Sequence, residues 1–226
     1  MNGKGDKPRV QWSNKYAENY NNIFGSKKMA AEETIINEMV EKDVGFLDPY
    51  ESTQGVADLK RHEGTVGNVY TDTGGVLHYG IGHKMTEEEV EAYQKSGKIK
   101  DDVTYASNVN FPELTVSQDK IDKTFALEYR AAVKEAQHYV GDKWDETPND
   151  IKDATINFIF NVGLPTAQEK FPGFRGALKK GDYGLASDHL MYVDPAKDRN
   201  DPENRSKYSE DVGQRAIDLS QLIGQY

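Results

Sequence analysis

Cysteine is absent from this chain of 226 residues. Disulfide bridges and thiolate metal sites are therefore excluded, and the redox compartment of the protein is left undetermined. Long apolar runs are absent too, so the sequence predicts no segment that spans a membrane. The first residues, Met1 to Pro8, lack the apolar core of a secretory signal. We therefore expect synthesis in the cytoplasm without a recognisable signal peptide.

Positive charge is scarce relative to negative charge. The chain has 28 Lys and Arg residues against 38 Asp and Glu residues, which gives a formal net charge of −10 at pH 7. Binding of nucleic acid needs clusters of Lys and Arg that face phosphates, so this balance argues against nucleic acid as a partner. The length is sufficient for one large domain, or for a domain with an extension.

The pattern along the chain predicts a domain with an extension. Residues 1 to about 27 are polar and rich in Asn, Lys and Tyr, which is typical of a loosely ordered segment or a linker. Residues 28–44 carry the apolar stripe of one amphipathic helix, and Pro49 ends that region. We therefore predict an N-terminal extension over residues 1–51 and the main domain over residues 52–226.

The main domain is predicted to begin with a helix near residues 53–62, capped by Ser52 or Thr53. This helix places Glu63 at its C-terminal end. Residues 69–81 then predict a hairpin around a Gly-Gly turn.

Alternation along the second strand of the hairpin assigns its side chains to faces. A period of two residues places four residues on one face, namely Val76, His78, Gly80 and Gly82. His78 thus shares its face with two glycines that leave room for a ligand. His83 points to the opposite, packed side.

The rest of the domain is predicted to be helical. We expect helices over 87–94, from Thr115 or Ser117 to Val140, and over 149–162, 173–180, 183–192 and 210–223. Residues 95–114 have too little pattern to assign, and residues 193–207 are predicted to form a long surface loop. The fold class is therefore α+β and mostly helical.

Two carboxyl groups flank the predicted hairpin start. Glu63 lies at a helix end, and Asp72 stands before the Gly-Gly turn. Two carboxyl groups in unlike surroundings, beside a smooth strand, suit hydrolysis of a glycosidic bond. Each also has an ordinary structural interpretation, because Glu63 is compatible with a solvated helix end and Asp72 with a turn-forming residue.

Other site motifs do not fit the sequence. His62-Glu63 lacks the second His of a zinc-protease helix, since Val66 stands there. Gly80-Ile81-Gly82 lacks the third glycine of a dinucleotide site. The acidic loop around Asp198 lacks the glycine of a calcium loop and has Pro202 at a ligand position. We therefore predict no metal site and no cofactor.

The motif around Glu63 resembles the active-site signature of the phage-type lysozymes, glycoside hydrolase family 24. Glu63 and Asp72 are separated by eight residues, as in the family, and Gly80-Ile81-Gly82-His83 matches the closing tetrapeptide. His78 stands where the family has Thr. Residues 153–163 resemble the central helix of the family's large lobe, and the resemblance extends from about Ser52 to the C-terminus.

The resemblance implies a two-lobed fold with a small β-hairpin lobe, a long connecting helix and a larger helical lobe. It implies an N-acetylmuramidase that cuts the β-1,4 bond between N-acetylmuramic acid and N-acetylglucosamine in peptidoglycan. Glu63 is then the general acid, and Asp72 stabilises the oxocarbenium-like transition state. His78 is expected to act as a base for water, as a nucleophile or as a stabiliser on the far face of the sugar; packing against the ligand is its structural alternative.

Further residues receive expected roles from the same resemblance. Substrate contacts are expected at Tyr70, Gly80, Gly82, Asn157 and Asn161. Structural support is expected from His83, Glu128 and Arg215. Glu128 borders the apolar face of its helix and needs a partner, for which His83 is the candidate. Arg215 is a candidate salt-bridge partner of Glu63, with surface solvation as the alternative.

Two other functions stay open from the sequence. One is a catalytically weak binding or structural module of a phage particle or of a delivered antibacterial toxin. The replacement at His78 and the acidic charge favour this alternative. The other is a lytic transglycosylase, which uses a single acid/base and would leave Asp72 nearly dispensable. The expected partners are peptidoglycan glycan strands, together with delivery machinery or an immunity protein for a toxin. The expected place of action is the cell wall or periplasm, after release or delivery.

Overall fold

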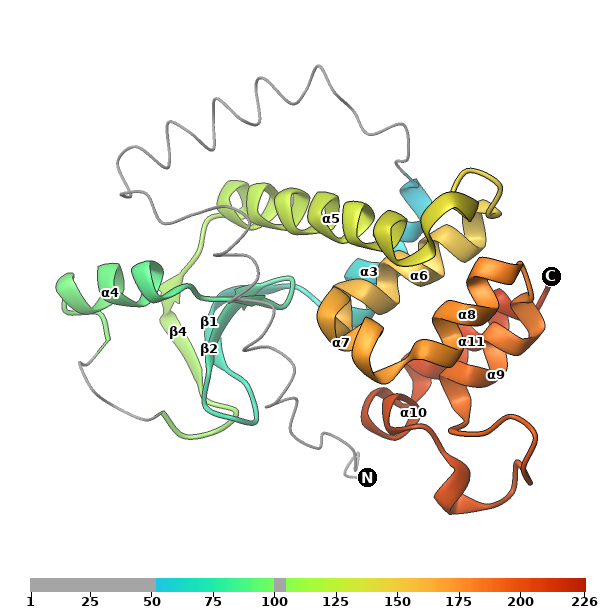
Figure 1. Cartoon of the computed structure of the whole chain (residues 1–226). Coiled ribbons are helices and arrows are strands. Elements are labelled where there is room, and N and C mark those ends of the chain that lie inside the picture. Colours follow the sequence, from blue (N-terminus) through green and yellow to red (C-terminus); the bar gives the residue numbers. More distant parts are fainter. Residues whose placement is uncertain (1–51, 100–104) are drawn as a thin grey trace.

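A computed structural model describes residues 52–99 and 105–226 (Figure 1). These residues form a mostly helical α+β fold, as predicted, with a small sheet lobe and a larger helical lobe. The predicted N-terminal extension, including the helix expected over residues 28–44, lies outside the described residues.

The sheet lobe contains four strands in the order β3-β2-β1-β4. The predicted hairpin is present, with β1 (Val66–Thr71) antiparallel to β2 (Leu77–Gly80). β3 (His83–Lys84) pairs with β2, and β4 (Asn110–Thr115) pairs with β1. β4 comes from the stretch whose sequence pattern was too weak to assign, because four of its six residues are exposed.

The alternation predicted for Val76 to Gly82 is wrong beyond Gly80. The strand ends there, and the backbone turns through positive φ angles of 65° at Gly80 and 74° at Gly82. Only glycine adopts such angles readily, so these two residues permit a tight turn. The turn breaks the period of two, so alternation along the strand does not assign a face to Gly82.

Most predicted helices are present, with bounds that agree with the prediction to within three residues. They are α3 (Thr53–Glu63), α4 (Glu87–Lys95), α5 (Gln118–Val140), α6 (Asn149–Val162), α8 (Pro172–Lys180) and α9 (Tyr183–Met191). Ser52 caps α3 by accepting from the Gly55 N–H, and Ser117 caps α5 in the same way from Lys120. Short elements that the sequence analysis missed are α7 (Leu164–Lys170), η1 (Gly141–Lys143) and η2 (Pro202–Asn204).

The single helix predicted over residues 210–223 is instead two helices. α10 (Lys207–Val212) ends at Gly213, whose φ is 51°, and α11 (Gln214–Ile223) follows directly. A residue in the left-handed region interrupts the helical hydrogen bonds, which explains the break. The break gives α11 a direction of its own, along which it packs against α6 and α9.

The long helix α5 runs from the sheet lobe to the helical lobe, where it packs against α6 (Figure 1). Its predicted apolar stripe is buried, namely Ile121, Phe125, Tyr129, Ala132, Ala136 and Tyr139. The centre of the helical lobe is the fully buried ring of Phe158, which meets the rings of Phe171, Phe174 and Tyr208 edge to face. Within the described residues, every helix is too short or too polar to traverse a lipid bilayer.

Candidate active site

Glu63 is the last residue of α3 and is paired with a cation from α11. Nη1 of Arg215 lies 2.6 Å from Oε1 of Glu63, and the two side chains are only 6% and 5% exposed. The predicted contact is therefore present, and surface solvation of Arg215 is not what the structure shows. The guanidinium holds one oxygen of the carboxyl group in a fixed place.

Asn157 of α6 fixes the guanidinium in turn. Its Oδ1 accepts from Nε of Arg215 at 2.8 Å, and its backbone oxygen accepts from Nη2 at 3.0 Å. Its Nδ2 lies 3.2 Å from Nδ1 of His62. Both polar atoms of this buried amide are thus engaged inside the protein, and contact with substrate stays a prediction for Asn157.

Gly82 lies between Glu63 and His78. A Cβ at this position would come within 2.9 Å of Oε2 of Glu63, so the glycine allows the second carboxyl oxygen to approach the backbone. On its other side, the Gly82 carbonyl oxygen is 3.3 Å from Nδ1 of His78. The loop after β2 therefore brings Glu63 and His78 to the same residue.

The two carboxylate oxygens of Asp72 make different contacts, one in the hairpin turn and one with His78. Its Oδ1 accepts from the N–H groups of Gly74 and Val76, at 2.8 and 2.9 Å, and so forms the hairpin turn. Its Oδ2 is 3.3 Å from Nε2 of His78. Turn formation and membership of the site are therefore compatible in this residue.

His78 is a buried imidazole whose two nitrogens differ. Nδ1 faces the Gly82 carbonyl, which only accepts, so Nδ1 carries the proton. Nε2 is buried and lies 3.3 Å from Oδ2 of Asp72. Burial lowers the pKa of His78, although Asp72 partly opposes the shift. The ring of Tyr70 stacks on the imidazole at a centroid distance of 5.6 Å, which orients it. The lowered pKa favours a neutral imidazole, whose unprotonated nitrogen is then Nε2, beside Asp72.

His83 is held between two carboxylates on the packed side of the hairpin. Its Nδ1 lies 2.7 Å from Glu128, as predicted, and its Nε2 lies 2.8 Å from Glu89. Burial disfavours the charged ring, but Glu128 and Glu89 outweigh this and raise the pKa of His83 to about 10. Burial also opposes ionisation of Glu89, yet the bonds from His83 and Lys120 bring the pKa of Glu89 well below its usual range.

Glu89 was not predicted from the sequence as a partner of His83. Its side chain accepts from the Thr86 N–H, and the Thr86 hydroxyl caps the Glu89 N–H, which completes a capping box at the start of α4. The Thr-x-x-Glu spacing signals this local role. Nothing in the spacing indicates that the same carboxylate also reaches His83 and the Tyr79 hydroxyl.

Two further residues predicted to contact substrate are Gly80 and Asn161. A Cβ on Gly80 would meet the side chain of Ile121 at 3.1 Å, so the bare face of Gly80 is turned toward α5. Asn161 lies one turn after Asn157 on α6 and is partly exposed. Their contact with substrate stays a prediction.

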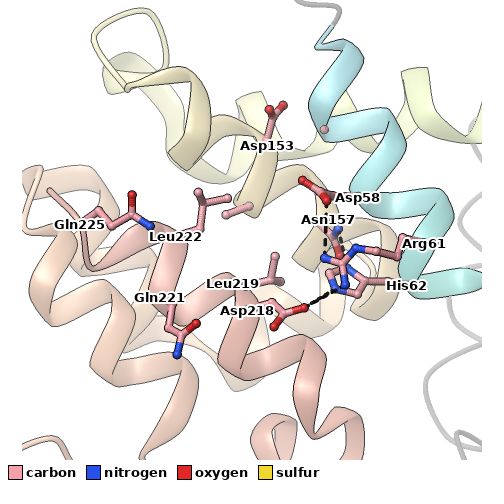
Figure 2. Close-up of a pocket in the computed structure, with 12 residues that line it drawn as sticks. Asp58, Arg61, His62, Asp153, Asn157, Asp218, Leu219, Gln221, Leu222 and Gln225 are labelled. Carbon is pink, nitrogen blue, oxygen red and sulfur yellow. Dashed lines mark hydrogen bonds and ion pairs between the residues drawn. The ribbon is translucent and has the colours of Figure 1, made fainter.

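A pocket of about 220 Å³ lies behind the site, between α3, α6 and α11 (Figure 2). Its lining includes Arg61, His62, Asn157 and Asp218, but none of Glu63, Asp72 and His78. His62 and Asp218 were not identified as site residues from the sequence. No cluster of His, Asp and Glu among the described residues is arranged to hold a metal ion.

The described residues combine an α+β fold with a buried carboxyl group at a helix end and a His–Asp pair at the hairpin turn. A family model described as phage lysozyme matches residues 60–201, which is more than half of the chain. The chain therefore belongs to the phage lysozyme family, and the family indicates a lysozyme-type glycosidase with peptidoglycan as its substrate. The match is shorter than the resemblance seen in the sequence, and Arg215 lies outside it. Comparison with curated proteins found no match.

Proposed function

We propose that the protein is an N-acetylmuramidase that hydrolyses the β-1,4 bond between N-acetylmuramic acid and N-acetylglucosamine. Glu63 is the general acid, His78 is the base for water, and Asp72 supplies negative charge beside His78. The observation that carries the proposal is the position of His78, which contacts Asp72 through Nε2 and the Gly82 carbonyl through Nδ1, while Gly82 also borders Oε2 of Glu63. The place of action is the bacterial cell wall, reached by release or delivery.

The first step is protonation of the bridging oxygen. Arg215 holds Oε1 of Glu63, and Oε2 lies toward Gly82. The step requires the protonated form of Glu63, and we assign its proton to Oε2, because Oε1 accepts from Arg215. The proton passes to the glycosidic oxygen while the bond between that oxygen and the anomeric carbon breaks. The departing N-acetylglucosamine keeps the oxygen as a hydroxyl group.

The second step is addition of water to the anomeric carbon. A water molecule forms the new C–O bond, and Nε2 of His78 takes its proton. The resulting imidazolium has its Nδ1–H on the Gly82 carbonyl and Asp72 Oδ2 beside Nε2, so its charge is balanced. Asp72 also stabilises positive charge on the sugar ring. Attack by water on the face opposite the leaving group inverts the anomer from β to α.

The first test is mass spectrometry of the soluble products after incubation with purified peptidoglycan. Muropeptides that end in reducing N-acetylmuramic acid support the proposal, and NMR of fresh product reads the anomer. A newly formed α-anomer is expected for attack by water. A β-anomer contradicts the role of His78 as a base for water.

The variants Glu63→Gln, Asp72→Asn and His78→Ala are each expected to lose activity, by about 100-fold or more for the acid. His138→Ala, at an exposed position on α5, is the matched control and keeps full activity. Products with anhydro ends and an active Asp72→Asn variant indicate a lytic transglycosylase instead. Binding to peptidoglycan without any product indicates a binding module.

A further inference from the structure

A continuous series of hydrogen bonds runs from the pocket behind the site to Glu63. It joins Asp218, His62, Asn157, Arg215 and Glu63, with contacts of 3.0, 3.2, 2.8 and 2.6 Å in that order. The residues come from three helices, α3, α6 and α11. Figure 2 shows the outer part of this series, where His62 reaches Asp218 across the pocket.

The chemistry of the groups sets the direction of every bond in the series. Arg215 has only donors, so the atom of Asn157 that meets Nε must be the amide oxygen. The amide nitrogen then faces Nδ1 of His62 and donates to it. Nδ1 must therefore be the unprotonated nitrogen of the ring. The proton of a neutral His62 is consequently on Nε2, where it donates to Asp218.

Asp218 is a suitable anchor for this proton. Hydrogen bonds from His62, and further ones from Gln214 and Arg61, lower the pKa of Asp218 to about 2. It therefore remains an acceptor throughout the neutral pH range. The His62 ring is almost fully buried, with 7% of its side chain exposed, so few other orientations are open to it.

We propose that His62 is a positioning residue for the reaction, which acts on Glu63 through Asn157 and Arg215. In the Nε2–H form, His62 fixes the orientation of the Asn157 amide. The amide then fixes the guanidinium, and the guanidinium fixes Oε1 of Glu63. In the opposite tautomer, Nδ1–H of His62 faces the amide N–H of Asn157, so two donors meet. If the amide of Asn157 flips, its N–H group faces Nε–H of Arg215 instead, and two donors meet there. The inference rests on the proposed role of Glu63 as the acid.

Two replacements of His62 separate the polar role from packing. His62→Leu fills the space of the ring with an apolar side chain but removes the Nδ1 acceptor. The kcat is then expected to fall about tenfold with little change in KM. His62→Asn places an amide oxygen near the position of Nδ1, and kcat is expected to recover to within about threefold of the wild type. His138→Leu is the matched control. Equal kcat for the wild type and the folded His62→Leu variant would overturn the proposal, as would a loss in His62→Leu that His62→Asn shares in full.

A measurement without substrate tests the same inference independently. In ¹⁵N-labelled protein, the ring nitrogens of His62 are assigned from the signals that disappear in His62→Asn. The expected spectrum is that of a ring with a protonated Nε2 and an unprotonated Nδ1, whereas a protonated Nδ1 contradicts the proposed bond directions. If the wild type shows no muramidase activity, the proposed function fails while this tautomer can still be found as expected.

Discussion

Arg215 and Glu63 form a buried ion pair across 152 positions of sequence, with 2.6 Å between Nη1 and Oε1. The pair joins the last helix of the described residues to the first one, α11 to α3. It places a charged group of the helical lobe directly behind the proposed acid. The pair, rather than Glu63 alone, is therefore the unit that mutation should test.

Removal of one member of this pair is expected to be costly. Arg215→Met leaves the carboxyl of Glu63 buried without its cation, and the free energy of unfolding should fall by about 3–5 kcal/mol in urea titrations. The double variant Glu63→Gln with Arg215→Met should lose less than the sum of the single losses. Lys95→Met, which removes an exposed pair with Glu91, is the control and should cost less than about 1 kcal/mol. Strict additivity in the double variant would contradict the pairing.

Gly82→Ala is expected to separate activity from stability. The new methyl group would lie within 2.9 Å of Oε2 of Glu63 and displace the carboxyl, so kcat should fall about tenfold or more. Gly97→Ala is matched in backbone strain, because φ is 70° at Gly97 and 74° at Gly82, but nothing lies within 4 Å of its Cβ. Both variants should lose about 1–2 kcal/mol of stability. Similar activity in the two variants would show that displacement of Glu63 is not the cause.

The stability contributed by His83 should disappear as the pH rises. The ordinary pKa of 6.5 applies in the unfolded chain, and the folded pKa is about 10. Between these values the folded state holds a proton that the unfolded state lacks, so stability falls with a slope of up to about 1.4 kcal/mol per pH unit. The stabilisation is fully present below pH 6.5. Urea titrations from pH 6 to 10 should show this loss in the wild type and not in His83→Gln. Parallel curves would rule out the raised pKa.

The proposed base also predicts a pH dependence of activity. Burial lowers the pKa of His78 below its ordinary 6.5, so the ring stays neutral and competent as a base in that range. The acid limb of kcat/KM should therefore lie below pH 6.5 and reflect protonation of His78. In His78→Thr, which restores the residue of the family pattern, this limb should be absent. A wild-type limb centred above pH 6.5 would contradict the assignment.

Local signals in the sequence were sufficient for much of the fold. The serine caps and apolar stripes located α3, α5 and α6, since these signals depend only on neighbouring residues. The exposed strand β4 and the short helix α7 have weak periodicity and escaped prediction. The break at Gly213 was missed because the apolar pattern continues through it, although the glycine itself was the available signal.

The site was predictable only as far as motif spacing reached. The motif indicated Glu63, Asp72 and His78, and family position suggested the partner of His83. The contacts of Asp218 with His62, and of Glu89 with His83, depend on how separate elements pack. No periodicity or spacing encodes such contacts, so they required the three-dimensional structure.

The long sequence separation between Glu63 and Arg215 has a consequence for biosynthesis. Arg215 follows Glu63 by 152 residues, and at roughly 5–20 residues per second a ribosome needs on the order of ten to thirty seconds to add them. During that interval the nascent polypeptide carries its acidic residue without the arginine that aligns it. Alignment of the acid therefore waits until Arg215 has been synthesised, and a nascent chain that lacks Arg215 is expected to remain inert.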